Sequence, residues 1–269
     1  MKKMAVIVSL ALFTASSAIV PFSATKVSAE ASASVWLNQD AVNRGVISVA
    51  YPVRSNVQTK VQITKGSTSY TYNLPSRAEQ AFPLQFGNGD YQVSVLEQVS
   101  GNKYRQIQKA SVTVKLDNPN EVFLNSVQNV RWQADSQAAK LAAELTKSAK
   151  TDEEKAKAIY AYLVKNIKYD KKLAATGVKS DYLPEADRTL ATKLGICYDY
   201  ASLYAAMLRS QNIPTKMLMG TSDYVNVYHA WNEVYLNGKW VTVDTTVDAG
   251  KGVQDFSKDK SKYKASKVY

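Results

Sequence analysis

The chain has 269 residues and 45% of them are hydrophobic, so it can bury the core of one large domain or of two small ones. Its 34 lysines and arginines exceed its 23 acidic residues, which gives a formal net charge of +11. Because the basic residues are scattered rather than clustered, this charge argues against a nucleic-acid partner. It better suits a surface that meets anionic cell-wall polymers or lipid head groups.

Residues 1–29 are expected to be a signal peptide. Lys2 and Lys3 precede a nearly uninterrupted apolar run over 4–20, and Val27-Ser28-Ala29 fits the small-x-small cleavage pattern. A retained membrane anchor is the alternative, although the run is short for a span. No later segment is apolar enough to cross a bilayer, so we expect no transmembrane span after signal removal. The mature protein is therefore expected to be secreted, extracellular or associated with the cell wall.

Residues 30–117 are expected to form a β-sandwich-like (Ig-like) accessory domain. Between 46 and 116 apolar and polar residues alternate, and Gly66 and the 87–90 segment supply turns. Short strands at this spacing, with no helical stretch between them, are typical of a β-sandwich. This part contains neither cysteine nor histidine, so we interpret it as a spacer or a docking module.

The period of the sequence becomes helical after Asp117-Asn118-Pro119-Asn120, which predicts a second domain over 118–269. Helices are expected at 138–145, at 151–167 after a Thr151/Glu154 capping box, and from Cys197 to about Gln211. Strands are expected at 215–220, 228–236 and 239–244. This order of helices and strands predicts an α+β fold. The lysine-rich tail is expected to be a solvated end, with attachment to the cell wall as the alternative; its lysines are Lys258, Lys260, Lys262, Lys264 and Lys267.

Cys197 is the only cysteine of the chain, and His229 is its only histidine. A lone cysteine cannot form an internal disulfide, and outside the cell a free thiol is open to oxidation. Cys197 precedes a strong helical pattern, and a helix N-terminus favours the thiolate, which is the nucleophilic form. The backbone N–H of Cys197 is also placed to bind an oxyanion. A buried cysteine that serves only as a small core residue is the structural alternative.

His229 and Asp244 are predicted to lie on the same face of a β-hairpin. Asn237-Gly238 is a strong two-residue turn signal, and it makes the numbers of paired residues sum to 475. His229 would then face Thr246, and Trp231 would face Asp244. His229 and Asp244 become diagonal neighbours, close enough for the carboxylate to accept the imidazole N–H and to stabilise the imidazolium.

Three sequence blocks resemble the signatures of the transglutaminase-like superfamily. They are Gly195-Ile196-Cys197-Tyr198-Asp199-Tyr200-Ala201, His229-Ala230-Trp231-Asn232-Glu233-Val234 and Trp240-Val241-Thr242-Val243-Asp244-Thr245-Thr246. Ile167-Lys168-Tyr169-Asp170, Arg209, Gly220 and the Ile213-Pro214 turn fit the same pattern, so the resemblance covers about residues 150 to 250. It implies a papain-like α+β core in which Cys197 is the nucleophile, His229 the base and Asp244 the orienting acid.

The chain departs from the family pattern in two places. Thr245 stands where proline is common, which is a mild change because no proton transfer uses that residue. Gly195-Ile196 lacks the glutamine or tryptophan that flanks the cysteine in calcium-dependent animal transglutaminases, which argues against that activity and against a calcium requirement. Trp231 and Trp240 are expected to pack in the core, with substrate stacking as the alternative. Asp199 and Glu233 are assigned no chemistry.

The leading hypothesis is an exported thiol enzyme that acts on amide bonds of proteins or peptides through an acyl-enzyme, with hydrolysis favoured over transfer to lysine. A protein cross-linking transglutaminase is one alternative, and a non-catalytic surface or cell-wall binding module is another. A cell-wall endopeptidase of the NlpC or CHAP type is less favoured, because its Asp-Cys-Ser-Gly block is missing. We expect no cofactor and no metal, because with one cysteine and one histidine a zinc site would need carboxylates for its other ligands.

Overall fold

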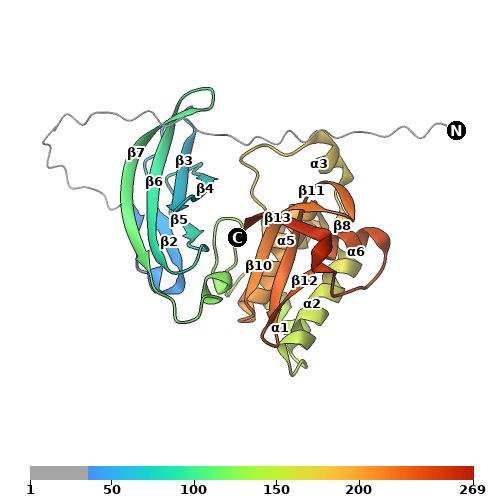
Figure 1. Cartoon of the computed structure of the whole chain (residues 1–269). Coiled ribbons are helices and arrows are strands. Elements are labelled where there is room, and N and C mark those ends of the chain that lie inside the picture. Colours follow the sequence, from blue (N-terminus) through green and yellow to red (C-terminus); the bar gives the residue numbers. More distant parts are fainter. Residues whose placement is uncertain (1–35) are drawn as a thin grey trace, which may run out of the picture. The chain divides into compact units, whose positions relative to one another are not determined.

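The computed structural model describes residues 36–269, so the predicted signal peptide lies outside the described residues. The chain forms two compact units, whose described parts are 36–127 and 128–269 (Figure 1). Among the helices of these described parts, none is both long and apolar enough to cross a membrane.

The first unit consists of two antiparallel sheets. One has the strand order β1-β2-β5 and the other β4-β3-β6-β7. Two 3₁₀ turns, η1 and η2, complete the unit. The elements are β1 Leu37–Asn38, η1 Val42–Arg44, β2 Val46–Val49, β3 Thr59–Lys65, β4 Thr68–Asn73, β5 Gln80–Pro83, β6 Gly89–Ser100, β7 Lys103–Val114 and η2 Glu121–Leu124.

Alternating apolar residues of both sheets fill the core of the first unit. Val61, Ile63, Val93 and Val95 are fully buried, and so is Ile47 in the smaller sheet. The ring of Tyr72 in β4 contacts that of Phe82 in β5, with 5.0 Å between the ring centroids, so the two sheets share this core. The short strands β1, β2 and β5 were not predicted, because two to four residues carry too little alternation to be recognised.

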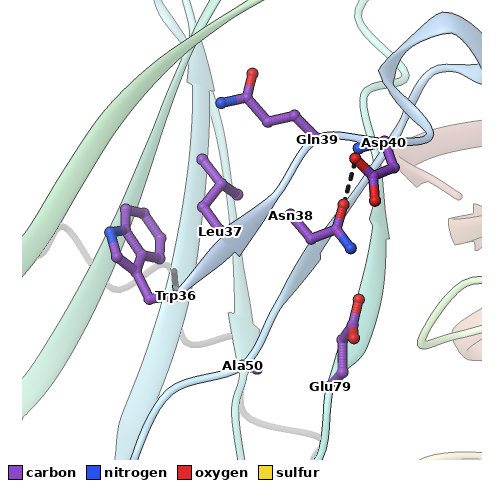
Figure 2. Close-up of a pocket in the computed structure, with 7 residues that line it drawn as sticks. All are labelled: Trp36, Leu37, Asn38, Gln39, Asp40, Ala50 and Glu79. Atoms are coloured by element: carbon purple, nitrogen blue, oxygen red, sulfur yellow. Dashed lines mark hydrogen bonds between the residues drawn. The ribbon is translucent and has the colours of Figure 1, made fainter. Parts of the chain in front are cut away.

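A cavity of about 290 Å³ opens at the start of the first unit (Figure 2). The backbone N–H of Asp40 donates to Asn38 Oδ1 at 2.8 Å on one side of it. Its lining residues are Trp36, Leu37, Asn38, Gln39, Asp40, Ala50 and Glu79. None of them belongs to the candidate functional site, which is built entirely from the second unit.

The second unit is mixed α and β, as predicted. A four-stranded antiparallel sheet has the order β12-β11-β10-β13, and β8 and β9 form a short parallel pair. Its helices are α1 Gln137–Thr146, α2 Asp152–Asn166, α3 Lys171–Thr176, α4 Ala186–Thr192, α5 Cys197–Ser210, α6 Thr245–Lys251 and the 3₁₀ turn η3 Lys260–Lys262. Its strands are β8 Lys168–Tyr169, β9 Leu194–Gly195, β10 Thr215–Ser222, β11 Val225–Leu236, β12 Lys239–Val243 and β13 Tyr263–Val268.

Helix α5 forms the centre of the second unit. It packs against β10 and β11 and also against α1, α2 and α4. Every residue from Tyr198 to Arg209 is buried, as expected of a helix that is apolar around most of its circumference. The predicted capping box of α2 is present: the Glu154 N–H donates to Thr151 Oγ1 at 3.1 Å, and Glu154 Oε2 accepts from the Thr151 N–H at 3.2 Å.

The lysine-rich segment is folded and not a loose end, although Lys260, Lys262 and Lys264 are exposed to solvent as their charge suggested. It folds into η3 and β13, and β13 pairs with β10 at the edge of the sheet. Lys258 is buried, with Nζ 2.6 Å from Asp248 Oδ1, and Lys260 lies 2.8 Å from Glu233 Oε1. The side chains of Lys258 and Lys260 thus pair with carboxylates of neighbouring elements. The charge run that resembled a tail is a folded segment that ends in a strand.

Candidate functional site

Cys197 is partly exposed and is the first residue of α5. The helix begins tightly, because a Cβ at Gly195 would lie 2.7 Å from Asp199 Cβ. Asp199 is itself buried, and its Oδ2 accepts the Ile196 N–H at 2.9 Å. The first N–H groups of an α-helix have no partner within the helix. As predicted, Cys197 lies at a helix N-terminus, beside these N–H groups.

His229 lies on β11 and is only 2% exposed. The strand is held against α5 by Asn232, whose Nδ2 donates to the Ala201 carbonyl at 2.9 Å and to the Lys216 carbonyl at 3.1 Å. This buried amide joins β11, which carries His229, to α5, which carries Cys197.

Asp244 follows β12, is fully buried and caps the N-terminus of α6. Its Oδ1 accepts the Val247 N–H at 3.0 Å, and its Oδ2 lies 2.8 Å from His229 Nε2. The hydroxyl of Tyr263 donates to the same Oδ2 at 2.9 Å. Because a carboxylate can only accept, Nε2 carries the proton, and Nδ1 is the ring nitrogen left for Cys197.

The predicted hairpin register is confirmed as far as β12 extends. Leu236 pairs with Lys239 and Asn232 with Val243, and the numbers of each pair sum to 475. Asn237 and Gly238 have φ values of 50° and 79°, as a type I′ turn requires. The predicted pairing of His229 with Thr246 is wrong, because the chain leaves the sheet at Asp244 and continues into α6. The predicted proximity of His229 and Asp244 survives this change.

The imidazole of His229 hydrogen-bonds to Asp244, and Cys197 lies near enough to act on its pKa. Burial by itself lowers the pKa of His229, but the hydrogen bonds and charges of these two partners outweigh it and raise the pKa to about 10. The ring therefore stays doubly protonated at pH values well above its ordinary pKa of 6.5. This arrangement suits an imidazolium placed between the carboxylate of Asp244 and the side chain of Cys197.

Two tyrosines lie beside the start of α5. Tyr169 on β8 pairs with Gly195 and is 37% exposed, and its pKa is raised by burial and then by the charges of Cys197 and Asp199. The hydroxyl of Tyr182 donates to Asp199 Oδ1 at 2.6 Å. Both tyrosines thus belong to the surroundings of the thiol.

A row of aromatic rings extends behind His229. Its ring stacks on that of Trp231 at 6.3 Å, Trp231 contacts Tyr263 at 5.0 Å, and Tyr263 contacts Tyr224 at 5.5 Å. Trp231 is buried, in agreement with the packing role expected of it. Trp240 lies against Tyr235 at 5.2 Å.

Sequence reasoning missed two residues of the site. Asp199 was left without a role, although it lies three residues after Ile196, where a carboxylate commonly accepts a hydrogen bond at a helix start. Tyr263 was assigned to the lysine-rich tail; only the weak alternation of Tyr263, Ala265 and Lys267 points to a strand there.

The comparisons with known proteins agree with the predicted resemblance. Residues 139–245 match the model of the transglutaminase-like superfamily, and this range contains Cys197, His229 and Asp244. The human kyphoscoliosis peptidase is 31% identical over 120 residues, which are 41% of this chain and 18% of that protein. The mouse kyphoscoliosis peptidase is 28% identical over 139 residues, which are 48% of this chain and 20% of that protein.

The chain therefore spans about a fifth of the length of the curated relatives that it matches. Among solved structures, the periplasmic domain of TgpA from Pseudomonas aeruginosa is 14% identical with a TM-score of 0.41, over 80% of this chain and 93% of that one. The family match agrees with the resemblance drawn from the three sequence blocks: residues 139–245 match the core of the transglutaminase-like superfamily.

Proposed function

We propose that this chain is a thiol enzyme that hydrolyses amide bonds of proteins or peptides through an acyl-enzyme on Cys197. The observation that carries the proposal is the buried hydrogen bond between His229 and Asp244, together with the place of Cys197 beside the same imidazole. The three residues come from α5, β11 and the start of α6, and the match to the transglutaminase-like superfamily covers all of them.

In the first half of the reaction, the Cys197 thiolate attacks the carbonyl carbon of the substrate amide. The carbonyl oxygen becomes an oxyanion, and the backbone N–H of Cys197 at the start of α5 is placed to stabilise it. When the C–N bond breaks, the electron pair leaves with the nitrogen and the imidazolium of His229 gives it a proton. The products are a free amine and a thioester on Cys197.

In the second half, the now neutral His229 takes a proton from water, whose oxygen attacks the thioester. The C–S bond breaks, the thiolate forms again and a carboxylic acid leaves. Asp244 accepts from Nε2 in both halves, so the ring keeps Nδ1 directed at the reacting groups. Asp244 is rigid because its other oxygen caps α6.

We further propose that the first unit is a β-sandwich accessory domain and that the mature protein is secreted or associated with the cell wall. The two antiparallel sheets with a shared core support the first statement. The sequence pattern of residues 1–29 and the net positive charge support the second.

The decisive experiment compares the full chain with Cys197→Ala on a broad peptide and protein library, with and without a labelled primary amine. Mass spectrometry follows new chain termini, released ammonia and amine incorporation. We expect Cys197-dependent hydrolysis to exceed amine incorporation, because an acyl-enzyme that water can reach is hydrolysed unless a closed site excludes water.

Isopeptide cross-links that disappear with Cys197→Ala, without new termini, would replace hydrolysis by transfer to lysine and would keep the three residues. If no product forms on any substrate, the protein is better described as a binding module of the cell surface.

A further inference from the structure

The hydroxyl of Tyr263 is the third hydrogen-bond donor to the carboxylate of Asp244. It lies 2.9 Å from Oδ2, the same oxygen that accepts from His229 Nε2, whereas the Val247 N–H occupies Oδ1. One oxygen thus accepts from both the imidazole and the phenol. The contact comes from β13, a strand outside the matched range 139–245.

Tyr263 is held firmly in this place. Its strand β13 lies so close to β10 that a Cβ at Gly220 would be 2.1 Å from the Lys264 carbonyl oxygen. Its ring lies between those of Trp231 and Tyr224. The hydroxyl therefore meets Asp244 because of the fold of β13 and the packing of the ring.

We propose that Tyr263 is a positioning residue that acts through Asp244: its hydroxyl fixes the carboxylate and moderates the hold of this carboxylate on the imidazolium of His229. The proposal rests on the proposed function for its consequence in turnover, because His229 must release a proton to the leaving amine. The effect of Tyr263 on the proton of His229 does not depend on the proposed function, because it is measurable without any substrate.

The sign of the effect follows from the charges. When His229 is neutral, Asp244 leaves an uncompensated negative charge; when His229 is protonated, the two form a neutral pair. A hydroxyl that donates to the carboxylate stabilises the first state more than the second. Without the hydroxyl, the imidazolium is harder to deprotonate, so the pKa of His229 rises and its proton is given up less readily.

Other titratable groups shift the pKa values of His229 and Tyr263. Cys197 on α5 and Asp244 raise the pKa of His229. Burial, the charge and hydrogen bond of Asp244, and then the charges of Tyr224 and Asp248 raise the pKa of Tyr263 far above its ordinary value. Tyr263 thus remains a neutral donor at every pH at which the enzyme would work.

The alternative is that Tyr263 matters only as a packed ring. Tyr263→Phe separates the two roles, because it keeps the contacts with Trp231 and Tyr224 and removes only the hydroxyl. Tyr224→Phe is the matched control: it removes a hydroxyl from the neighbouring ring, for which the described residues give no hydrogen bond to Asp244.

The first test is an NMR titration of His229, whose ring C–H signals are unambiguous because it is the only histidine. The full chain is prepared without a histidine tag and in the Cys197→Ala background, which removes the contribution of Cys197 and so lowers the pKa of His229 toward neutrality. We expect Tyr263→Phe to raise the pKa of His229 by about half a unit or more and Tyr224→Phe to leave it unchanged. An unchanged or lowered pKa in Tyr263→Phe would overturn the proposal.

The second test measures kcat/KM of the active chain on the best library substrate, because in turnover His229 must give its proton to the leaving amine. Tyr263→Phe is expected to slow the wild-type chain several-fold and to have little further effect in an Asp244→Asn background, because residues that act through one another are not additive. Equal effects in both backgrounds would mean that the hydroxyl does not act through Asp244. If no substrate is found, the proposed function fails, while the titration still decides the role of Tyr263.

Discussion

Asn232 of β11 donates its side-chain amide to the carbonyl of Ala201 in α5 at 2.9 Å. This buried hydrogen bond joins the strand that carries His229 to the helix that carries Cys197. Asn232 is three residues from His229, and Ala201 is four residues from Cys197. The separation between thiol and imidazole is therefore set by a side chain that need not touch a substrate.

Asn232→Ala is expected to lower the free energy of unfolding by about 1–3 kcal/mol, because the carbonyls of Ala201 and Lys216 both lose this side-chain donor. The reaction of Cys197 with a thiol probe should slow as well, since β11 no longer holds His229 at a fixed distance from Cys197. Chemical denaturation and probe kinetics measure the two effects. Asn226→Ala, at an exposed position of the same strand, is the control and should change neither. Equal behaviour of the two variants would refute the role of Asn232.

Cys197 should react with a neutral alkylating reagent in the folded full chain near neutral pH. It is partly exposed at a helix N-terminus, and the neighbouring His229 can serve as the base that takes the proton of the thiol. Intact-mass spectrometry follows the single adduct, and His229→Gln should react more slowly. Labelling that appears only after denaturation would make Cys197 a core residue and would end the enzyme interpretation.

Asp244→Asn should preserve the fold and remove most of the activity. Asparagine is as good an N-cap as aspartate, so the amide oxygen of the variant can still accept the Val247 N–H, but it supplies no charge to the imidazolium. We expect kcat/KM to fall more than tenfold, or more than about 1.4 kcal/mol in activation free energy, with little change in Tm. A smaller loss at unchanged Tm would remove Asp244 from the mechanism.

The sequence predicted the second unit well because its signals are local. The apolar run after Cys197 gave α5, Thr151 and Glu154 gave the start of α2, and Asn237-Gly238 gave a register that holds from Leu236 to Asn232. That register needs only the turn and the strand period, so the proximity of His229 and Asp244 could be inferred from the sequence alone.

The contacts that complete the site could not be predicted because they join distant segments. Tyr263 reaches Asp244 only because β13 returns to the edge of the sheet, next to β10. The charge of the lysine run pointed to solvent, and its ion pairs with Glu233 and Asp248 exist only in the folded unit. The short helices α3, α4 and α6 were missed because six or seven residues give little periodicity.

The value of kcat/KM should stay close to its maximum up to about pH 10 and decline at higher pH. Burial lowers the pKa of His229, but Asp244 and Cys197 raise it to about 10, and the leaving amine needs the protonated ring. In Asp244→Asn the alkaline decline should move to lower pH, because the main partner of the ring is lost. A decline near pH 6.5 in the wild-type chain would contradict the imidazolium assignment.

Gly220→Ala should disturb the site from a distance. A Cβ at this position would lie 2.1 Å from the Lys264 carbonyl oxygen, so β13 must move away from β10, and Tyr263 moves with it. We expect a loss of about 1–3 kcal/mol in unfolding free energy, as for other overpacked positions, together with faster hydrogen exchange in β13 and a lower kcat/KM. Gly250→Ala in α6 is the matched control: its Cβ meets nothing within 4 Å, and alanine stabilises a helix. Equal stability and exchange in the two variants would show that the close approach of β13 to β10 is not needed to hold Tyr263.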